Sequence, residues 1–287
     1  MKNAAIALLS ALALGACAQS QTASAPAEQA ASVRLYAMNC GELNVSNADA
    51  FADDGSYAGV QRRFVVPCYL IRHPQGDLIW DTGLPDALAL LPDGRTTPIG
   101  HMRMARTLAS QLAELGLTPA DIEFLSVSHS HVDHIGNGGL FAQSTWIVDP
   151  DERAHAFRDA ARADTESFSF YSALENAQTR LIEGDAPHDV FGDGSVQIVP
   201  TPGHTPGHTI LQLRLANAGV VLLTGDMWHL AESREGRRVP RFNVNREQTL
   251  ASMDRIEAIA AATNARVVRE HVPEDFEALP AFPAYLD

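Results

Sequence analysis

The sequence His129-Ser-His131-Val-Asp133-His134 places three histidines and one aspartate within six residues. Side chains two residues apart at the end of an extended strand lie on the same side, so His129 and His131 can hold one ion. Asp133 and His134 follow where the chain must turn, and they can face a second ion. Imidazole and carboxylate are ordinary ligands of zinc, manganese, iron and cobalt. We interpret the stretch as part of a metal centre; the alternative is a polar loop that is merely rich in histidine.

Three further strand-like runs each end at a potential metal ligand. Residues 196–199 lead into a turn rich in proline and glycine, 219–225 form an apolar run, and 265–270 repeat the pattern near the C-terminus. The ligands that follow these runs are His204, Asp226 and His271. Side chains that project from the ends of strands in a rigid sheet are expected to form a preorganised site.

These motifs, taken in order, resemble those of the metallo-β-lactamase superfamily of hydrolases, from about residue 33 to the C-terminus. Within that superfamily the chain most resembles the quorum-quenching N-acyl-homoserine lactone lactonases. The further points of likeness are Pro67-Cys-Tyr-Leu-Ile, Ile79-Trp-Asp81-Thr-Gly, the doubled Thr-Pro-Gly-His turn and Phe282-Pro-Ala-Tyr-Leu. The resemblance implies an α/β (α+β) fold, an αβ/βα sandwich. Two mixed β-sheets would lie face to face, with helices on both outer sides and the metals at one sheet edge.

The resemblance also implies two divalent metal ions per chain. The first ion would be held by His129, His131 and His204, the second by Asp133, His134 and His271, and both by a bridging Asp226. All of these ligands offer nitrogen or oxygen, which fits zinc as the expected metal and leaves iron, manganese and cobalt as alternatives.

The implied reaction is the opening of a lactone ester bond by a hydroxide that bridges the two metals. Asp133 would pass a proton to the leaving oxygen, and no Gly-x-Ser-x-Gly nucleophile motif competes with this mechanism. The lactonases carry a tyrosine three residues after the bridging aspartate, where this chain has His229. His229 could donate a hydrogen bond to the developing oxyanion. Alternatively, it marks a different substrate, with Met227 and Trp228 in the pocket wall, or it faces solvent.

Other polar residues have less specific interpretations. Asp81 either orients a ligand histidine or is an ordinary turn aspartate, and His208 either supports the site or caps its turn. Residues 92–106 could form a lid or acyl-chain groove, or a subunit contact in a homodimer, although packing is the commoner role of such a methionine-containing stripe. For the histidines outside every motif we predict solvated surface positions; they are His73, His101, His155 and His188.

The acidic composition, with a formal net charge of -14, argues against nucleic acid as a partner and leaves a small-molecule substrate. A thioesterase of the glyoxalase II type is an alternative function, but the short acidic C-terminal part lacks that branch's basic binding region. A β-lactamase is a weaker alternative, because those enzymes lack the bridging aspartate at position 226. A protein that binds metal only structurally needs fewer ligands than the seven found here.

The N-terminal sequence predicts export. Residues 1–17 read as a signal peptide whose end, Leu14-Gly-Ala-Cys17, resembles a lipobox, so Cys17 would carry a lipid anchor. Residues 18–32 would form a flexible tether, and residues 33–287 a single hydrolase domain. The protein would be a periplasmic or outer-membrane lipoprotein that contacts the membrane only through this anchor. Cys40 and Cys68 could pair or remain buried thiols.

Hydrophobic spacing and turn residues predict the secondary structure of the domain. The expected strands are 33–39, 63–72, 77–80, 124–127, 145–148, 180–182, 196–199 and 209–215, together with the runs that end at the proposed ligands. The expected helices are 104–115, 150–158 and 247–262, with another starting after Thr118.

Overall fold

The computed structural model describes Met1 and residues 32–287. The predicted signal peptide, Cys17 and nearly all of the tether lie outside the described residues, so these assignments and the domain boundaries stay predictions. Among the helices that the structure describes, none combines the length and the apolar character needed to cross a membrane.

The domain contains thirteen strands and several short helices. The strands are β1 (Arg34–Val45), β2 (Arg62–His73), β3 (Gly76–Trp80), β4 (Arg95–Thr96), β5 (Gly100–Arg103), β6 (Phe124–Ser126), β7 (Thr145–Val148), β8 (Thr179–Leu181), β9 (His188–Asp189), β10 (Val196–Pro200), β11 (Thr209–Leu215), β12 (Gly219–Leu223) and β13 (Arg266–Val268). The α-helices are α1 (Leu108–Glu114), α2 (Val132–Ile135), α3 (Pro150–Ala156), α4 (Asp159–Ala163), α5 (Thr165–Ser169), α6 (Ala231–Gly236), α7 (Arg246–Thr263) and α8 (Pro273–Glu277). The 3-10 helices are η1 (Ala48–Phe51), η2 (Asp86–Leu90), η3 (Pro119–Asp121), η4 (Gly138–Phe141), η5 (Ser172–Asn176) and η6 (Gly225–Met227).

The strands form two mixed sheets. The eight-stranded sheet has the order β4-β5-β1-β2-β3-β6-β7-β8, and the five-stranded sheet has the order β13-β12-β11-β10-β9. The first sheet is antiparallel from β1 to β3 and parallel from β3 through β8, while the second is antiparallel except for the parallel pair of β12 and β13.

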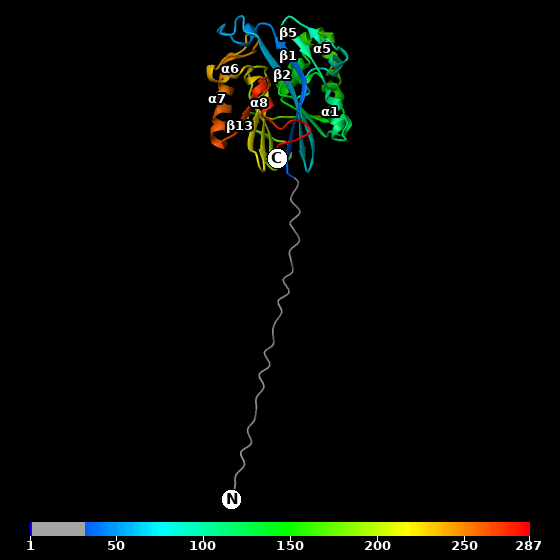
Figure 1. Cartoon of the computed structure of the whole chain (residues 1–287), viewed down its shortest axis with the longest axis vertical. Coiled ribbons are helices and arrows are strands. Elements are labelled where there is room, and N and C mark those ends of the chain that lie inside the picture. Colours follow the sequence, from blue (N-terminus) through cyan, green and yellow to red (C-terminus); the bar gives the residue numbers. More distant parts are fainter. Residues whose placement is uncertain (2–31) are drawn as a thin grey trace. The chain divides into compact units, whose positions relative to one another are not determined.

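Three large clusters of hydrophobic side chains are buried in the domain, one between the two sheets and one on the outer face of each sheet. The largest buried cluster joins strands of both sheets, including Trp80 and Ile147 from the first sheet and Leu211 from the second. A second cluster covers the first sheet with α1, and a third covers the other sheet with α7. Figure 1 shows α1 and α7 on opposite sides of the strands. This four-layer arrangement confirms the predicted αβ/βα sandwich.

The predicted elements agree with the structure more closely for strands than for helices. The predicted helix 104–115 is shorter, because it begins only after Thr107, whose side chain caps the backbone N–H of Ser110. The predicted helix after Thr118 is a single 3-10 turn. The open question about the two domain cysteines is resolved: Cys40 and Cys68 form a disulfide, with Cα atoms 5.8 Å apart.

Candidate metal centre

Seven side chains at the ends of four strands meet in one place. The cluster from His129 to His134 follows β6, while the other three ligands follow strands of the second sheet, namely β10, β12 and β13. The site is thus built from both sheets. The short helix α2 starts after His131, and it carries Asp133 and His134, whose ring lies beside that of His129 with centroids 4.1 Å apart. The sequence-based expectation that each ligand follows a strand is confirmed.

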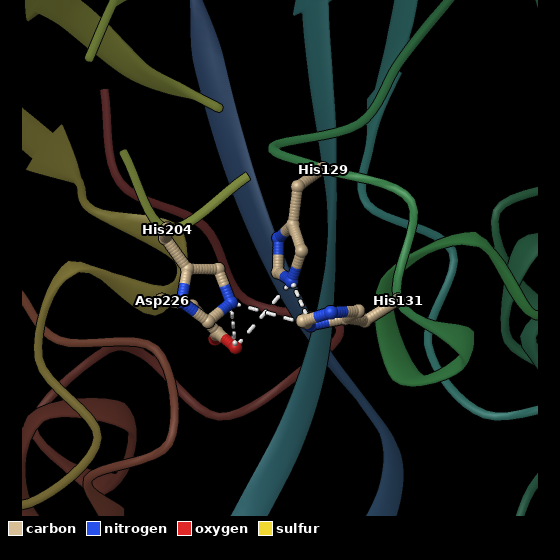
Figure 2. A group of neighbouring side chains, drawn as sticks. All are labelled: His129, His131, His204 and Asp226. Atoms are coloured by element: carbon tan, nitrogen blue, oxygen red, sulfur yellow. Dashed lines mark hydrogen bonds and ion pairs between the residues drawn. The ribbon is translucent and has the colours of Figure 1, made fainter. Parts of the chain in front are cut away.

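The first group of side chains consists of His129, His131, His204 and Asp226. One potential ligand atom from each of them lies within 4.8 Å of all the others. The Nδ1 atom of His131 lies 2.8 Å from Nε2 of His129 and 3.2 Å from Nε2 of His204. The Oδ2 atom of Asp226 lies 3.4 Å from Nε2 of His129 and 3.2 Å from Nε2 of His204. Figure 2 shows the three rings gathered around the aspartate, with His129 and His131 on one segment of the chain and His204 on another.

Asp133, His134 and His271 form a second group, in which one potential ligand atom from each residue also lies within 4.8 Å of the others. The Oδ1 atom of Asp226 lies 3.1 Å from Nε2 of His134 and 2.8 Å from Nε2 of His271. The Oδ2 atom of Asp133 is more distant from these two nitrogens, at 3.9 and 3.7 Å. The two carboxylate oxygens of Asp226 therefore face different groups, which is the arrangement required of a bridging ligand.

The backbone beside Asp226 is adapted to this position. Gly225 has φ = 49°, and a Cβ atom on it would lie 2.7 Å from Cβ of Ser128 and 2.8 Å from Nε2 of His208. Only glycine allows so close an approach in this conformation. The backbone N–H of Asp226 donates to Nε2 of His208 at 3.2 Å, so His208 holds the aspartate through its backbone. This contact favours the supporting role for His208.

The buried polar atoms of the site fit cations. Nε2 of His134, Nδ1 of His204 and Oδ1 of Asp226 are buried without a hydrogen-bond partner. In the first group, Nδ1 of His131 faces Nε2 of His129 and Nε2 of His204, which is unfavourable unless a cation or proton lies between the nitrogens. The Nδ1 atom of His271 donates to the carbonyl oxygen of Val65 at 2.9 Å, which leaves Nε2 as the lone-pair atom directed at the site.

The electrostatics divide the histidines into two sets. Burial and the nearby His204 lower the pKa of His131 to about 3, and burial together with His134 lowers the pKa of His129 well below its usual range. Burial also lowers the pKa of His134, but Asp226 and Asp133 outweigh it and raise that pKa well above the usual value. His129 and His131 are therefore neutral, as metal ligands must be, and the carboxylates that raise the pKa of His134 are groups that also attract a metal cation.

Asp81 orients His134 from behind. It is fully buried; its Oδ2 lies 3.0 Å from Nδ1 of His134, and its Oδ1 accepts the backbone N–H of Ser128 at 2.6 Å. The expectation of an orienting role therefore agrees with the geometry. Glu270 lies on the same side, with Oε1 3.8 Å from Nδ1 of His134. Burial raises the pKa of Glu270 well above its usual range, and Asp81 raises it further.

His229 is buried, so the alternative that it faces solvent is wrong. Its Nε2 atom lies 3.0 Å from Oδ2 of Asp226, and its ring packs against Phe51 and Phe242, with centroids 5.0 and 5.6 Å away. The ring therefore contacts the bridging carboxylate. The expectation that Met227 shapes the pocket wall is also wrong, because it is buried in the core beneath α7.

Trp228 lies in the same core cluster as Met227, and it too is absent from the cavity wall. The cavity above the metal groups has a volume of about 340 Å³. Its lining includes Asp133, Asp226, His131, His229, His271 and Val132, with an apolar wall of Leu43, Phe51, Phe64, Ile99, Met102 and Phe242. Two residues of the segment 92–106 thus face the cavity, which favours the groove interpretation. The subunit contact and the homodimer stay predictions.

The predicted surface role is wrong for His73. This side chain is buried at the end of β2, where Nε2 lies 2.9 Å from Oδ2 of Asp193 and the ring stacks on Phe191 with centroids 3.9 Å apart. The remaining histidines outside the motifs are partly exposed; they are His101, His155 and His188.

Sequence reasoning missed several residues around the centre. Ser128 bonds to ligand rings, since its hydroxyl lies 3.0 Å from Nδ1 of His129 and 3.2 Å from Nδ1 of His134. Glu152 is buried against the two ligand-bearing loops. For Ser128, the only signal in the sequence is its position directly before the histidine cluster. Nothing in the sequence distinguishes Glu152 from an ordinary acidic residue in the first turn of a helix.

Comparisons with known proteins agree with this geometry. The model of the metallo-beta-lactamase superfamily matches residues 62–265. The N-acyl homoserine lactonase AttM of Azorhizobium caulinodans is 30% identical over 267 residues, which cover 89% of this chain and 99% of AttM. An N-acyl homoserine lactonase of a Bacillus species is 29% identical, over 76% of this chain and 86% of that protein.

Solved structures give the same result. A crystal structure of an N-acyl homoserine lactone hydrolase, with the product N-hexanoyl-L-homoserine bound at its catalytic metal centre, matches with a TM-score of 0.72 and 25% identity. The match covers 88% of this chain and 98% of the other. A mutant of AiiA from B. thuringiensis, with N-decanoyl-L-homoserine at its active site, matches with the same TM-score, identity and coverage.

Proposed function

The chain belongs to the metallo-beta-lactamase superfamily, and we propose that it is a metal-dependent hydrolase that opens the ester bond of N-acyl homoserine lactones. The observation that carries the proposal is Asp226, whose two oxygens face two separate groups of ligands at 2.8 to 3.4 Å. The lactonases to which the chain is similar, one of them with product at a metal centre, supply the substrate class.

The two groups of ligands would hold two metal ions. The first ion would be held by His129, His131 and His204, the second by Asp133, His134 and His271, and both by Asp226. Zinc is the metal that we propose, because the ligands offer only imidazole nitrogen and carboxylate oxygen. When bound, such a pair of ions lowers the pKa of a coordinated water and polarises the ester carbonyl.

Asp133 has the freedom that a proton-transfer residue needs. Its side chain is 25% exposed, whereas that of Asp226 is 4% exposed. It also lines the cavity, so it can contact a substrate there. We assign to Asp133 the transfer of a proton to the oxygen that leaves when the lactone opens.

His229 contacts the same carboxylate that bridges the two groups. Because its Nε2 atom is 3.0 Å from Asp226 Oδ2, its N–H is directed at the carboxylate and not into the open cavity. Its catalytic contribution would then be to hold Asp226 in its bridging orientation. Donation to the substrate oxyanion, the alternative expected from the sequence, would require the ring to turn.

The cavity wall supports a substrate with an apolar chain. Phe51, Phe64 and Phe242 enclose the space above the ligands, and Leu43 completes the wall. An acyl chain packed against these rings loses contact with water, which favours binding. The thioesterase and β-lactamase alternatives are not favoured, because the relatives that cover most of the chain carry the name of lactonases.

We also propose that the protein is exported and anchored through a lipid on Cys17. The lipobox-like sequence supports this proposal. The disulfide between Cys40 and Cys68 is consistent with it, because disulfides persist mainly in oxidising compartments such as the bacterial periplasm. Labelling of growing cells with a radioactive fatty acid would test the anchor. Label on the unsubstituted chain and none on its Cys17→Ser variant would support it.

The enzymatic proposal is tested with the purified, metal-loaded chain and its Asp226→Ala variant. The substrates are a series of N-acyl homoserine lactones, a penicillin and a glutathione thioester, and bound metal is counted in parallel. We expect two metals per chain and lactone opening that Asp226→Ala abolishes. Turnover of the thioester or the penicillin alone would reject the lactonase assignment, and a chain that binds no metal after reconstitution would reject the binuclear centre.

A further inference from the structure

A buried carboxylate outside the ligand set joins two loops of the metal centre. Glu152 lies in α3 and is 1% exposed. Its Oε1 atom accepts the backbone N–H and the hydroxyl of Ser130, at 2.7 and 2.6 Å. Its Oε2 atom accepts the hydroxyl of Thr205 at 2.5 Å and the backbone N–H of Gly207 at 3.2 Å. One side chain therefore receives four hydrogen bonds, two from each loop.

These loops carry the three histidines of the first group. Ser130 stands between His129 and His131 in the sequence, and Thr205 directly follows His204. The loops are far apart in the chain, so the carboxylate of Glu152 forms a direct bridge between them. The distance between the ligands of one ion thus depends on a residue that binds no ion.

The loop that contains Thr205 and Gly207 packs closely against the start of α3 and has no free space in which to shift along it. A Cβ atom on Gly207 would lie 2.4 Å from the backbone nitrogen of Glu152 and 2.5 Å from Oδ1 of Asp149. Glycine is therefore required for the turn to approach the start of the helix, and the turn contacts the same end of α3 that carries Glu152.

We propose that Glu152 is a positioning residue for the first metal, which it serves by fixing His129 and His131 relative to His204. The inference rests on the proposed metal-dependent function. Burying a carboxylate without a cation beside it is costly, and the four donors offset that cost only while both loops keep their places. A neutral side chain could connect the helix to either loop, but a carboxylate serves both, since each oxygen accepts two hydrogen bonds.

The inference predicts an effect on one metal only. None of the hydrogen bonds of Glu152 reaches Asp133, His134 or His271. His134 is oriented separately, by Asp81, and His271 by the carbonyl oxygen of Val65. Loss of Glu152 should therefore weaken the first ion and leave the second in place.

The test compares the full chain with its Glu152→Gln variant, using cobalt(II) as the probe. The amide has one acceptor oxygen, so two of the four donors would face its NH₂ group. We expect one cobalt ion to bind about 10- to 100-fold more weakly, the range found when groups behind metal ligands are replaced. The weakened ion should be the one at the first site, and its visible absorption should change. The ion at the second site should keep its affinity. Asp151→Asn, the same chemical change at an exposed neighbour on α3, should bind both ions as the unsubstituted chain does.

Other results would overturn the inference. If Glu152→Gln binds both ions normally, Glu152 only supports the fold. If both ions weaken equally and the metal-free variant also melts at a lower temperature, the effect is general. Should Glu152→Gln not fold, Glu152→Asp keeps the charge but is one methylene too short to reach both loops, and it should show the same selective loss. An unsubstituted chain that binds two ions but opens no lactone would contradict the proposed function and leave this test intact.

Discussion

Replacing Asp81 by asparagine should weaken the second metal site and leave the fold intact. Asp81 accepts the backbone N–H of Ser128 through Oδ1 at 2.6 Å and contacts Nδ1 of His134 through Oδ2 at 3.0 Å. Asparagine has one acceptor oxygen, so its NH₂ group must face either Ser128 N–H or the ring. If it faces the ring, Nδ1 becomes the acceptor and the ring proton moves to Nε2, the atom that is directed at Asp226. The substitution should not strain the backbone, because asparagine tolerates the φ of 53° at this position as well as aspartate does.

The expected loss is about 10- to 100-fold in affinity for one ion. That factor corresponds to roughly 1.4 to 2.7 kcal/mol. It would be measured by competition with a chromogenic chelator, with circular dichroism and thermal melting as tests of the fold. Asp77→Asn is the matched control, because Asp77 is also buried but lies at the opposite end of β3. Two ions bound by Asp81→Asn with unchanged affinity would refute the reasoning about the tautomer of His134.

Three further outcomes follow from other contacts. His229→Phe should lower metal affinity, and His229→Gln should recover part of it because the amide can still donate to the bridging carboxylate; a fall in kcat of about 10²- to 10³-fold with metal affinity unchanged would indicate an oxyanion donor instead. Reduction of the disulfide between Cys40 and Cys68, which lie 28 residues apart, should lower the free energy of unfolding by roughly 3.6 kcal/mol, measured in urea with and without reductant. Hydrogen bonds from Ser195, together with His73, lower the pKa of Asp193 to about 2, so Asp193 stabilises the fold above its ordinary pKa of 3.8, and that contribution is lost as the pH falls through about 2. Between these two pH values the unsubstituted chain should lose more stability than Asp193→Asn, as measured by urea unfolding at both ends of the range. The Asp193 side chain is 46% exposed, so solvent can screen its pair with His73. If the two chains lose the same stability within experimental error, this screening is complete.

The proposed metal ligands were predictable because each follows directly from a local pattern. A short apolar strand fixes where the chain leaves the sheet, and a ligand side chain three residues later is then placed at the sheet's end. This holds for Asp226 after β12 and for His271 after β13. The neighbouring turn residues also have local causes, as the positive φ of Gly225 illustrates. The division of ligands between two metals came from the resemblance to the lactonases, and the two oxygens of Asp226 now give it a geometric basis.

The errors fall where position depends on packing between distant segments. Nothing in the sequence around His73 distinguishes it from a surface histidine; it is buried because Phe191 and Asp193, on a hairpin of the other sheet, pack against it. Met227 and Trp228 follow Asp226, and one alternative interpretation of the sequence places them in the pocket wall. The chain turns through η6 at that point, which directs both side chains into the core beneath α7.

The same distinction applies to substrate choice. The apolar wall of the cavity is assembled from segments that are distant in sequence: Phe51 follows β1, Phe64 lies in β2, Ile99 and Met102 belong to the β4–β5 hairpin, and Phe242 precedes α7. None of these residues is close in sequence to a metal ligand, and each would be an ordinary hydrophobic residue in isolation. The chemistry of the proposed centre is therefore encoded in short local motifs, whereas the acyl chain that we propose it accepts depends on how four distant segments pack around the cavity. Substitutions at Phe51 or Phe242 should accordingly change the preferred chain length before they change the number of metals bound.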